Sequence, residues 1–314
     1  MNKEEVNEQK LVSGILFSVV IPLYNRAPAI AATIASVLAQ TFQDFEIVVI
    51  DDGSKDNPEP VIAAIGDPRI RLIRQDNAGG GAARNRGIDE ARGQFIAFLD
   101  SDDSFLPNHL ESMKALLDGT SNTVGYSPII VDRGEGRTFI KPPRALGENE
   151  AMADYVMRDR GFVQTSGLVV PTDIARKVRY RLGLPFGQDT DFAIRLDLFG
   201  CRFQMSKTPT VIWNDMFDPA RVSANRKGHR VVDWLEEMRP IVSEKAYLGY
   251  RGWHVAKGIA PSQPLLAMRY YATAVVKGCY RPKLAIAILL QIVLPTNLYR
   301  SLSDRVVSVM GRSN

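Results

Sequence analysis

Residues 45–52 read FEIVVIDD, a run of apolar and β-branched residues that ends in two aspartates. A strand with one face in water alternates apolar and polar residues, whereas this run is mostly apolar until its end, as is typical of a strand covered on both faces. β-branched runs recur at residues 17–21 (FSVVI), 69–73 (RIRLI) and 94–99 (QFIAFL). The sequence therefore predicts four strands of a buried parallel sheet.

Segments with helical periodicity separate these four strands. Pro28 opens an alanine-rich stretch that runs to Ala39, and further helical stretches follow at residues 58–65 and 82–92. Proline is well tolerated in the first turn of a helix. Strands that alternate with helices at this spacing are joined by right-handed crossovers, which place helices on both faces of the sheet. The predicted fold class is α/β, with a mostly parallel, Rossmann-like sheet flanked by helices.

After Asp118 the pattern becomes mixed and then helical. The predicted strands lie at 124–131, 137–140, 162–170, 202–205 and 210–213, and the predicted helices at 189–199, 231–247, 265–277 and 283–294. From this order we divide the chain into three regions. They are an N-terminal tail (1–16), an α/β domain (17–225) and a basic helical C-terminal region (226–314).

Composition excludes several classes of protein. With 45% hydrophobic and 24% charged residues and no glycine or proline period, the chain is neither collagen-like, coiled-coil nor wholly disordered. Cys201 and Cys279 are too few and too far apart for a disulfide framework or a zinc site, which fits a reducing cytoplasm. From Ala220 onward there are 15 Lys/Arg and 5 Asp/Glu, a net +10, so the overall +4 leaves −6 for residues 1–219. This asymmetry predicts a site for cations in the first part and a surface for anions in the last.

Asp100-Ser101-Asp102-Asp103 directly follows the fourth predicted strand. Three carboxylates in four residues repel one another unless a positive charge lies among them, and a divalent cation with oxygen ligands is the natural partner. The alternative is structural, with Asp103 or Ser104 capping the helix that begins near Pro107. A second acidic pair ends the strand at 45–50, and the carboxyl ends of parallel strands share one edge where ligands bind. Two such pairs on one edge favour a functional site.

Two common phosphate-binding motifs are absent from the sequence. No G-x-x-x-x-G-K-[ST] occurs, which argues against a P-loop nucleoside triphosphatase. Residues 79–81 (GGG) follow the third predicted strand without the G-x-G-x-x-G register of a dinucleotide site. A nucleotide held by carboxylates and a metal ion remains.

The ordered motifs of the first 110 residues resemble the family 2 inverting glycosyltransferases of GT-A fold. The segments that carry the resemblance are SVVIPLYNR (18–26), SVLAQT (36–41), FEIVVIDDGS (45–54), NAG (77–79), ARN with Gly87 (83–87) and FLDSDD (98–103). A later segment, FGQDTDF (186–192), is similar to the Glu-Asp segment of that family. It departs from the family by having Gln188 where glutamate is usual. The resemblance implies a GT-A domain over residues 17–225.

The resemblance also implies roles for residues that bind the nucleotide sugar. Pro22 and Tyr24 would line the nucleobase pocket, and Asp52 would accept hydrogen bonds from the uracil or its ribose. Asp100 would face the ribose, and Arg84 would help to hold the nucleotide.

For the chemistry, the resemblance implies a metal ligand and a base. Asp102 would bind the Mn²⁺ or Mg²⁺ that bridges the diphosphate, and Asp189 would deprotonate the acceptor hydroxyl. Asp191 is the competing candidate for the base, although it also lies four residues before Arg195, where the two side chains can pair on a helix.

Histidines and one tryptophan are weaker candidates. His109, just inside a predicted helix, is expected on the surface, and His229 is expected in a solvated basic loop rather than at the diphosphate. Trp213 is either an acceptor contact, since aromatic faces pack on sugar rings, or a core residue at the end of a strand.

The C-terminal region suggests a membrane surface. Arg269, Lys277, Arg281 and Lys283 flank apolar runs, as expected of helices that lie on an anionic membrane. The longest apolar run, 284–294, is shorter than the ~20 residues of a spanning helix, and it could equally be a core helix. The N-terminus lacks the apolar stretch of a signal peptide, and no recognition motif supports nucleic acid binding.

Together these features predict an enzyme on the inner face of the cytoplasmic membrane. By resemblance to succinoglycan-type exopolysaccharide enzymes, it would transfer glucose from a UDP-sugar to a lipid-linked saccharide with inversion. The alternatives are a sugar-phosphate nucleotidylyltransferase, whose Gly-rich basic N-terminal signature is missing, and an inactive UDP-sugar-binding or membrane scaffold, which only Gln188 favours.

Overall fold

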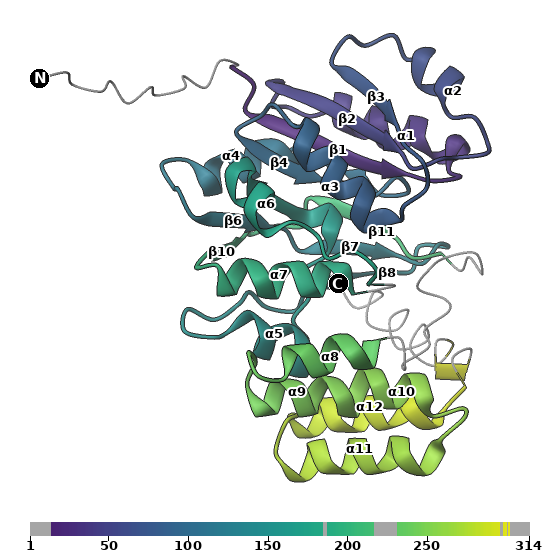
Figure 1. The fold of residues 1–314 in the computed structure, drawn as a ribbon, viewed down its shortest axis with the longest axis vertical. Coiled ribbons are helices and arrows are strands. Elements are labelled where there is room, and N and C mark those ends of the chain that lie inside the picture. The colour runs from purple at the N-terminus through teal and green to yellow at the C-terminus, as the bar shows by residue number, and fades with distance from the viewer. Residues whose placement is uncertain (1–13, 185–186, 217–230, 296–297, 300, 302–314) are drawn as a thin grey trace, which may run out of the picture.

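A computed structural model describes residues 14–184, 187–216, 231–295, 298–299 and 301 (Figure 1). Its main sheet has seven strands, in the spatial order β10 (Arg202–Met205), β6 (Thr123–Tyr126), β9 (Leu168–Pro171), β4 (Phe95–Phe98), β1 (Phe17–Leu23), β2 (Phe45–Asp51) and β3 (Ile70–Arg74). A second sheet has the order β5 (Ser104–Phe105), β11 (Val211–Asn214), β7 (Ile129–Asp132) and β8 (Thr138–Lys141).

Helices cover the main sheet and extend beyond it. Those of the α/β part are α1 (Ala27–Leu38), α2 (Glu59–Ala63), α3 (Gly80–Glu90), α4 (His109–Leu117), α5 (Met152–Arg158), α6 (Thr172–Val178) and α7 (Gln188–Leu198), with a 3₁₀ turn, η1 (Thr165–Gly167). The C-terminal helices are α8 (Val232–Met238), α9 (Glu244–Tyr250), η4 (Arg251–Val255), α10 (Ala256–Ile259), α11 (Pro264–Val276) and α12 (Pro282–Val293). They form a separate layer at one end of the molecule (Figure 1).

The centre of the main sheet is parallel and buried on both faces. β1 pairs in parallel with both β2 and β4, and β2 pairs in parallel with β3. Successive side chains of β1 enter opposite cores: Val20 belongs to one, and Val19 and Ile21 to the other. Because neither face meets water, every position of β2 is buried, which explains its nearly unbroken apolar sequence. The predicted α/β fold with a mostly parallel sheet is confirmed.

Helix α3 lies directly on strand β1. A Cβ atom added at Gly87 would stand 2.2 Å from Cγ1 of Val20, so only glycine permits this approach. This contact holds the second half of α3 tightly against β1.

Three predicted elements are wrong, each for a local reason. Residues 124–131 were expected as one strand, but Ser127 and Pro128 interrupt it, and the halves become β6 and β7 in different sheets. Residues 162–170 contribute a strand only from Leu168 onward, after the η1 turn. The helix expected at 231–247 is broken near Pro240 into α8 and α9, since proline cannot continue a helix interior.

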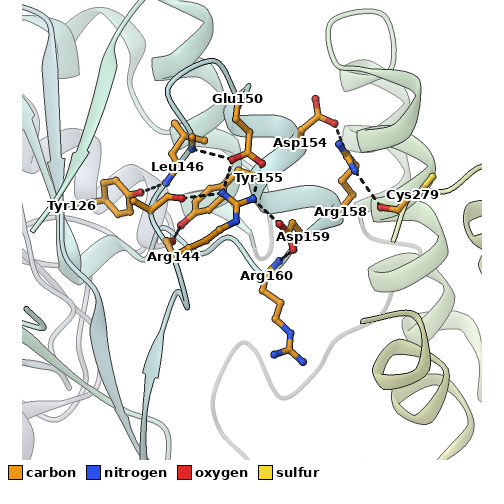
Figure 2. Close-up of polar contacts among 12 residues, drawn as sticks. Tyr126, Arg144, Leu146, Glu150, Asp154, Tyr155, Arg158, Asp159, Arg160 and Cys279 are labelled. Carbon is orange, nitrogen blue, oxygen red and sulfur yellow. Dashed lines mark hydrogen bonds and ion pairs between the residues drawn. The ribbon is translucent and has the colours of Figure 1, made fainter. Parts of the chain in front are cut away.

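Helix α5 ties the loop after β8 to the C-terminal helices. Arg144 in that loop pairs with Glu150 at 2.6 Å and with Asp159, just beyond α5, at 2.6 Å (Figure 2). On the same helix, Arg158 donates to the backbone carbonyl of Cys279 at 3.5 Å (Figure 2). Its Cβ would lie only 2.5 Å from a Cβ added at Gly249 of α9, so α5 and α9 are in direct contact.

Asp191 makes a second connection between the α/β part and the C-terminal helices. Its fully buried carboxylate pairs with Arg195 at 2.6 Å and with Arg181 at 3.2 Å, and it accepts a hydrogen bond of 2.8 Å from the indole N–H of Trp234 in α8. A buried charge with this many partners fixes its neighbours in place, because moving any of them away would weaken the compensation of that charge.

Replacing this carboxylate should destabilise the protein. We expect Asp191→Asn to lower the free energy of unfolding by about 3 kcal/mol, because the two arginines lose their buried anion. Urea denaturation followed by circular dichroism measures the change. Asp173→Asn, at an exposed aspartate that pairs with Lys177 on α6, is the control and should change stability by less than about 0.5 kcal/mol. Equal effects of the two variants would contradict a structural role for Asp191.

Candidate functional site

The carboxyl ends of β1, β2 and β4 form one edge that carries the predicted nucleotide residues. The backbone N–H of Asp52 donates to the carbonyl of Leu23 at 2.8 Å, which places Asp52 beside Tyr24. Tyr24 is 45% exposed, so its ring is accessible at this edge. Pro22, within β1, lies opposite Ile50 of β2, one step before the same edge. The structure thus brings Pro22, Tyr24 and Asp52 together, as the sequence predicts.

Asp52 is engaged by its own chain. Its buried carboxylate accepts hydrogen bonds from the side chain of Gln75 (2.8 Å) and the backbone N–H groups of Ala78 (2.9 Å) and Gly79 (2.8 Å). Gly79 has a φ of +89°, a conformation that suits glycine. Asp52 therefore fixes the loop that leads into α3, and its direct contact with a nucleobase stays a prediction.

Arg84 of α3 lies between two other elements of the site. Its guanidinium donates to Asp100 at 2.5 Å and to the side-chain oxygen of Gln188 at 2.9 Å, and it lies 5.3 Å from the ring centroid of Tyr180. Burial by itself would lower the pKa of Arg84, but the charge and hydrogen bond of Asp100, together with Tyr180 and Asp189, outweigh burial, so the pKa is raised. Arg84 is thus a permanent positive charge that joins the end of β4 to the start of α7.

Asp103 has a structural role, although it does not cap a helix. Its carboxylate accepts hydrogen bonds from Ser166 (2.5 Å), Gln164 (2.9 Å) and the backbone of Asn214 (3.1 Å), and only 1% of the residue is exposed. The cap of α4 is Asn108, so the expectation that Asp103 or Ser104 caps this helix is wrong. Burial, together with the charges of Asp100 and Asp102, raises the pKa of Asp103 well above its usual range.

The donor set at this edge suits a hard divalent cation. Asp102 is partly exposed and, with Asp100, makes the surroundings of Asp103 strongly negative. In the part of the chain that the structure describes, no three His, Cys, Asp or Glu side chains converge to hold a metal ion. Mg²⁺ and similar ions are commonly bound by one or two carboxylates together with substrate phosphates. The residues therefore fit an ion that arrives with a diphosphate.

Asp189 and Asp191 differ sharply in their surroundings. Asp189, in the first turn of α7, is half-buried, and its carboxylate accepts a hydrogen bond of 2.8 Å from the backbone N–H of Thr190. Burial raises the pKa of Asp189, which the backbone N–H and Arg84 partly oppose. Asp191 is fully buried and already accepts hydrogen bonds on both oxygens. Of the two, only Asp189 is partly exposed, so it stays the candidate for the base.

The predictions for two histidines have different outcomes. His109 was expected on the surface, but it is fully buried, stacks on Phe105 with 3.9 Å between the ring centroids, and shares a 2.7 Å hydrogen bond with Thr210. Burial lowers the pKa of His109 to about 3, so it is neutral and structural. His229 lies outside the described residues.

The sequence reasoning missed Ser166 and Gln164. Ser166 holds residues 100–103, the acidic turn, in place, because its hydroxyl accepts a hydrogen bond of 3.0 Å from the N–H of Asp100 and donates one to Asp103. Both residues come from a turn more than sixty positions away, and no local pattern in the sequence marks them.

The sequence of this chain matches a known protein family. The sequence profile described as "Glycosyl transferase family 2" matches residues 18–181, more than half of the 314-residue chain. The chain belongs to this family. Its match includes the strand ends that carry Tyr24, Asp52 and Asp100, whereas α7 lies beyond it.

This glycosyltransferase resembles named bacterial relatives. It is 28% identical over 256 residues to the "Amylovoran biosynthesis glycosyltransferase AmsB" of Erwinia amylovora, which covers 77% of this chain and 84% of the relative. It is 43% identical over 121 residues to the "Succinoglycan biosynthesis protein ExoO" of Rhizobium meliloti, covering 38% of this chain and 35% of the relative.

A solved structure shares the fold of this glycosyltransferase. The crystal structure of S. aureus TarS 1-349 in complex with UDP-GlcNAc superposes with a TM-score of 0.64 at 19% identity, over 95% of this chain and 92% of that chain. At this identity the likeness shows the fold alone, which is GT-A as the sequence motifs imply.

Gln188 gives a direct test of the site's electrostatics. In this glycosyltransferase Gln188→Glu would put a second carboxylate against Arg84 and beside Asp189, and negative charge raises the pKa of a neighbouring carboxylate. A base acts only when deprotonated, so we expect the acid limb of the pH–rate profile to move to higher pH. Transfer rates measured from pH 5 to 9 would reveal it. Gln204→Glu on β10 should leave the profile unchanged, and an unshifted profile in Gln188→Glu would remove Asp189 from the role of base.

Proposed function

We propose that the protein transfers glucose from UDP-glucose to a lipid-linked saccharide, with inversion, in the biosynthesis of a bacterial exopolysaccharide. The names of the relatives, amylovoran and succinoglycan biosynthesis proteins, support the pathway. The complex of TarS with UDP-GlcNAc supports a UDP-sugar as the donor class.

One observation carries the proposal. Arg84 joins Asp100 to Gln188, and the next residue along α7 is Asp189. The candidate base is therefore fixed beside the carboxylate expected to face the nucleotide's ribose. A nucleotide sugar whose ribose contacts Asp100 would therefore lie close to an acceptor hydroxyl held by Asp189.

The chemistry follows from this placement. A sugar hydroxyl is a weak nucleophile, and a positioned carboxylate that accepts its proton contributes roughly 100- to 10,000-fold to the rate. The reaction passes through an oxocarbenium-like state as the bond to the nucleoside diphosphate breaks. A single base, with attack opposite the leaving group and no covalent intermediate, gives inversion at the anomeric carbon.

Asp102 would hold Mn²⁺ or Mg²⁺, with the diphosphate oxygens completing the coordination. The ion, when bound, stabilises the negative charge that grows on the leaving diphosphate. Arg84 adds a fixed positive charge near the same place.

Transfer assays with two variants test the enzymatic proposal. With UDP-glucose, Mn²⁺ and a membrane lipid extract, Asp189→Asn should lose at least about 100-fold in transfer while still binding UDP. Asp102→Asn should lose metal-dependent transfer. Radiolabelled glucose in the lipid fraction measures transfer, and calorimetry measures UDP binding.

Asp173→Asn, on the exposed face of α6, serves as the control and should transfer normally. Wild-type protein that binds UDP yet transfers no sugar would support the scaffold alternative instead. Full transfer by Asp189→Asn would eliminate it as the base.

We further propose that the C-terminal helices rest on the anionic inner face of the cytoplasmic membrane. α11 exposes Leu265, Met268 and Val276 at helical spacing, and α12 exposes Ile286, Leu290 and Val293. Exposed basic residues stand at the ends of both helices: Lys277, Arg281 and Lys283. None of the described helices is both long and apolar enough to span a bilayer. Apolar side chains bordered by cations match an anionic lipid surface.

Vesicle binding tests this surface. We expect the protein to co-sediment with phosphatidylglycerol-containing vesicles, and less with pure phosphatidylcholine or at high salt. The double variant Leu265→Glu/Val276→Glu should lower the partition coefficient at least about tenfold, because each buried apolar side chain contributes ~1.5–3 kcal/mol. Leu198→Glu, at an exposed leucine of α7, is the matched control and should bind normally. Unchanged binding of the double variant would exclude this face.

A further inference from the structure

Three aromatic rings surround the ammonium group of Lys141. The Lys141 nitrogen lies 5.6 Å from the ring centroid of Phe139, 5.1 Å from Phe162 and 5.7 Å from Trp213. The rings of Phe162 and Trp213 contact each other in a tilted arrangement, with an interplanar angle of 30° and centroids 5.6 Å apart. We call these four residues the aromatic cluster.

The second sheet sets the positions within the cluster. Trp213 of β11 and Phe139 of β8 both pair with Val131 of β7, so they flank it in one row across the sheet. Lys141 is two residues beyond Phe139 and therefore on the same face. Val131 is fully buried, whereas all four members of the aromatic cluster are only half-buried. The cluster packs on the core at one side and stays partly open at the other.

Two chain segments connect the aromatic cluster to the acidic turn. The residue after Trp213 is Asn214, whose N–H donates to Asp103 at 3.1 Å, and two residues after Phe162 comes Gln164, which donates to Asp103 at 2.9 Å. One or two residues span at most ~4–7 Å of chain. Asp103 directly follows Asp102, so the cluster borders the place where the diphosphate is expected to leave.

The cluster and the nucleotide residues belong to different sheets. Tyr24 and Asp52 lie at the ends of β1 and β2 in the main sheet, whereas Phe139, Lys141 and Trp213 belong to the second sheet. The acidic turn, between β4 and β5, joins the two. If the nucleotide sugar binds at the main sheet, the second sheet remains available to bind the acceptor.

We infer that Phe162 and Trp213 are the platform on which the saccharide of the acceptor stacks, held in orientation by Lys141. The faces of aromatic rings carry partial negative charge, which attracts both the Lys141 ammonium and the weakly positive C–H groups of a sugar ring. A partly exposed pair of aromatic rings with an ammonium group over it combines an apolar surface with a hydrogen-bond donor, as a pyranose requires. This inference rests on the proposed function, which supplies the saccharide acceptor.

Substitutions that remove the flat faces but keep apolar bulk test the platform. With UDP-glucose as donor and a membrane lipid extract as acceptor, Trp213→Leu and Phe162→Leu should raise the apparent KM for the extract by about tenfold or more. The KM for UDP-glucose and the affinity for UDP should change by less than about twofold. Trp213→Phe keeps an aromatic face, so its apparent KM for the extract should stay close to that of the wild type.

Phe203→Leu is the matched control. Phe203 is also a half-buried ring, but it lies on β10, an edge strand of the main sheet, and not in the second sheet. This variant should leave both KM values unchanged. If the Trp213 and Phe162 variants lose stability with both KM values intact, the rings are core residues and the platform is rejected. The same conclusion follows if both KM values rise equally.

A second measurement does not depend on turnover. Saturation-transfer NMR with methyl β-D-glucopyranoside, in the presence of UDP and Mn²⁺, should detect binding to wild-type protein and lose it in Trp213→Leu. Wild-type protein that binds neither UDP nor UDP-glucose would refute the proposed function, whereas UDP binding with the same glucoside signal in wild type and Trp213→Leu would refute the platform alone.

Discussion

The candidate site depends on the buried guanidinium of Arg84. A charge removed from water must have partners, and these come from two other parts of the chain: Asp100 at the end of β4 and Gln188 at the start of α7. Glycine eases the close approach of α3 to its neighbours, since a Cβ at Gly81 would lie 3.1 Å from the carbonyl oxygen of Arg181, closer than ordinary van der Waals contact. The nucleotide edge and the candidate base are therefore held at a fixed separation by one side chain.

The aspartates of the site divide into two groups. Asp52, Asp103 and Asp191 accept several hydrogen bonds from the protein itself and fix a loop, a turn and the C-terminal helices, respectively. Asp102 and Asp189 are less buried and lie at the edge where a substrate would bind. An acidic cluster in a sequence thus mixes carboxylates that build the site with carboxylates that could act in it, and burial and hydrogen bonding separate them.

The C-terminal helices are joined to the α/β part near the site. Asp191 lies two residues after Asp189 on α7 and binds Trp234 of α8, while Arg158 of α5 reaches the backbone of Cys279 before α12. A helical layer attached in this way is held in a fixed position relative to the base. If that layer rests on a membrane, the acceptor's lipid and its reacting sugar would be presented to the enzyme together.

The sequence by itself determined the parallel strands, their helices and the edge that carries Tyr24, Asp52 and Asp100. Continuous apolar runs and helical periodicity are local signals, and parallel strands necessarily share their carboxyl edge. Only the tertiary structure decided which aspartates are structural, that His109 is buried, that residues 124–131 enter two sheets, and that Phe162 meets Trp213. Most of these outcomes depend on contacts between residues about 20 to more than 100 positions apart, and such contacts leave no periodic trace in the sequence.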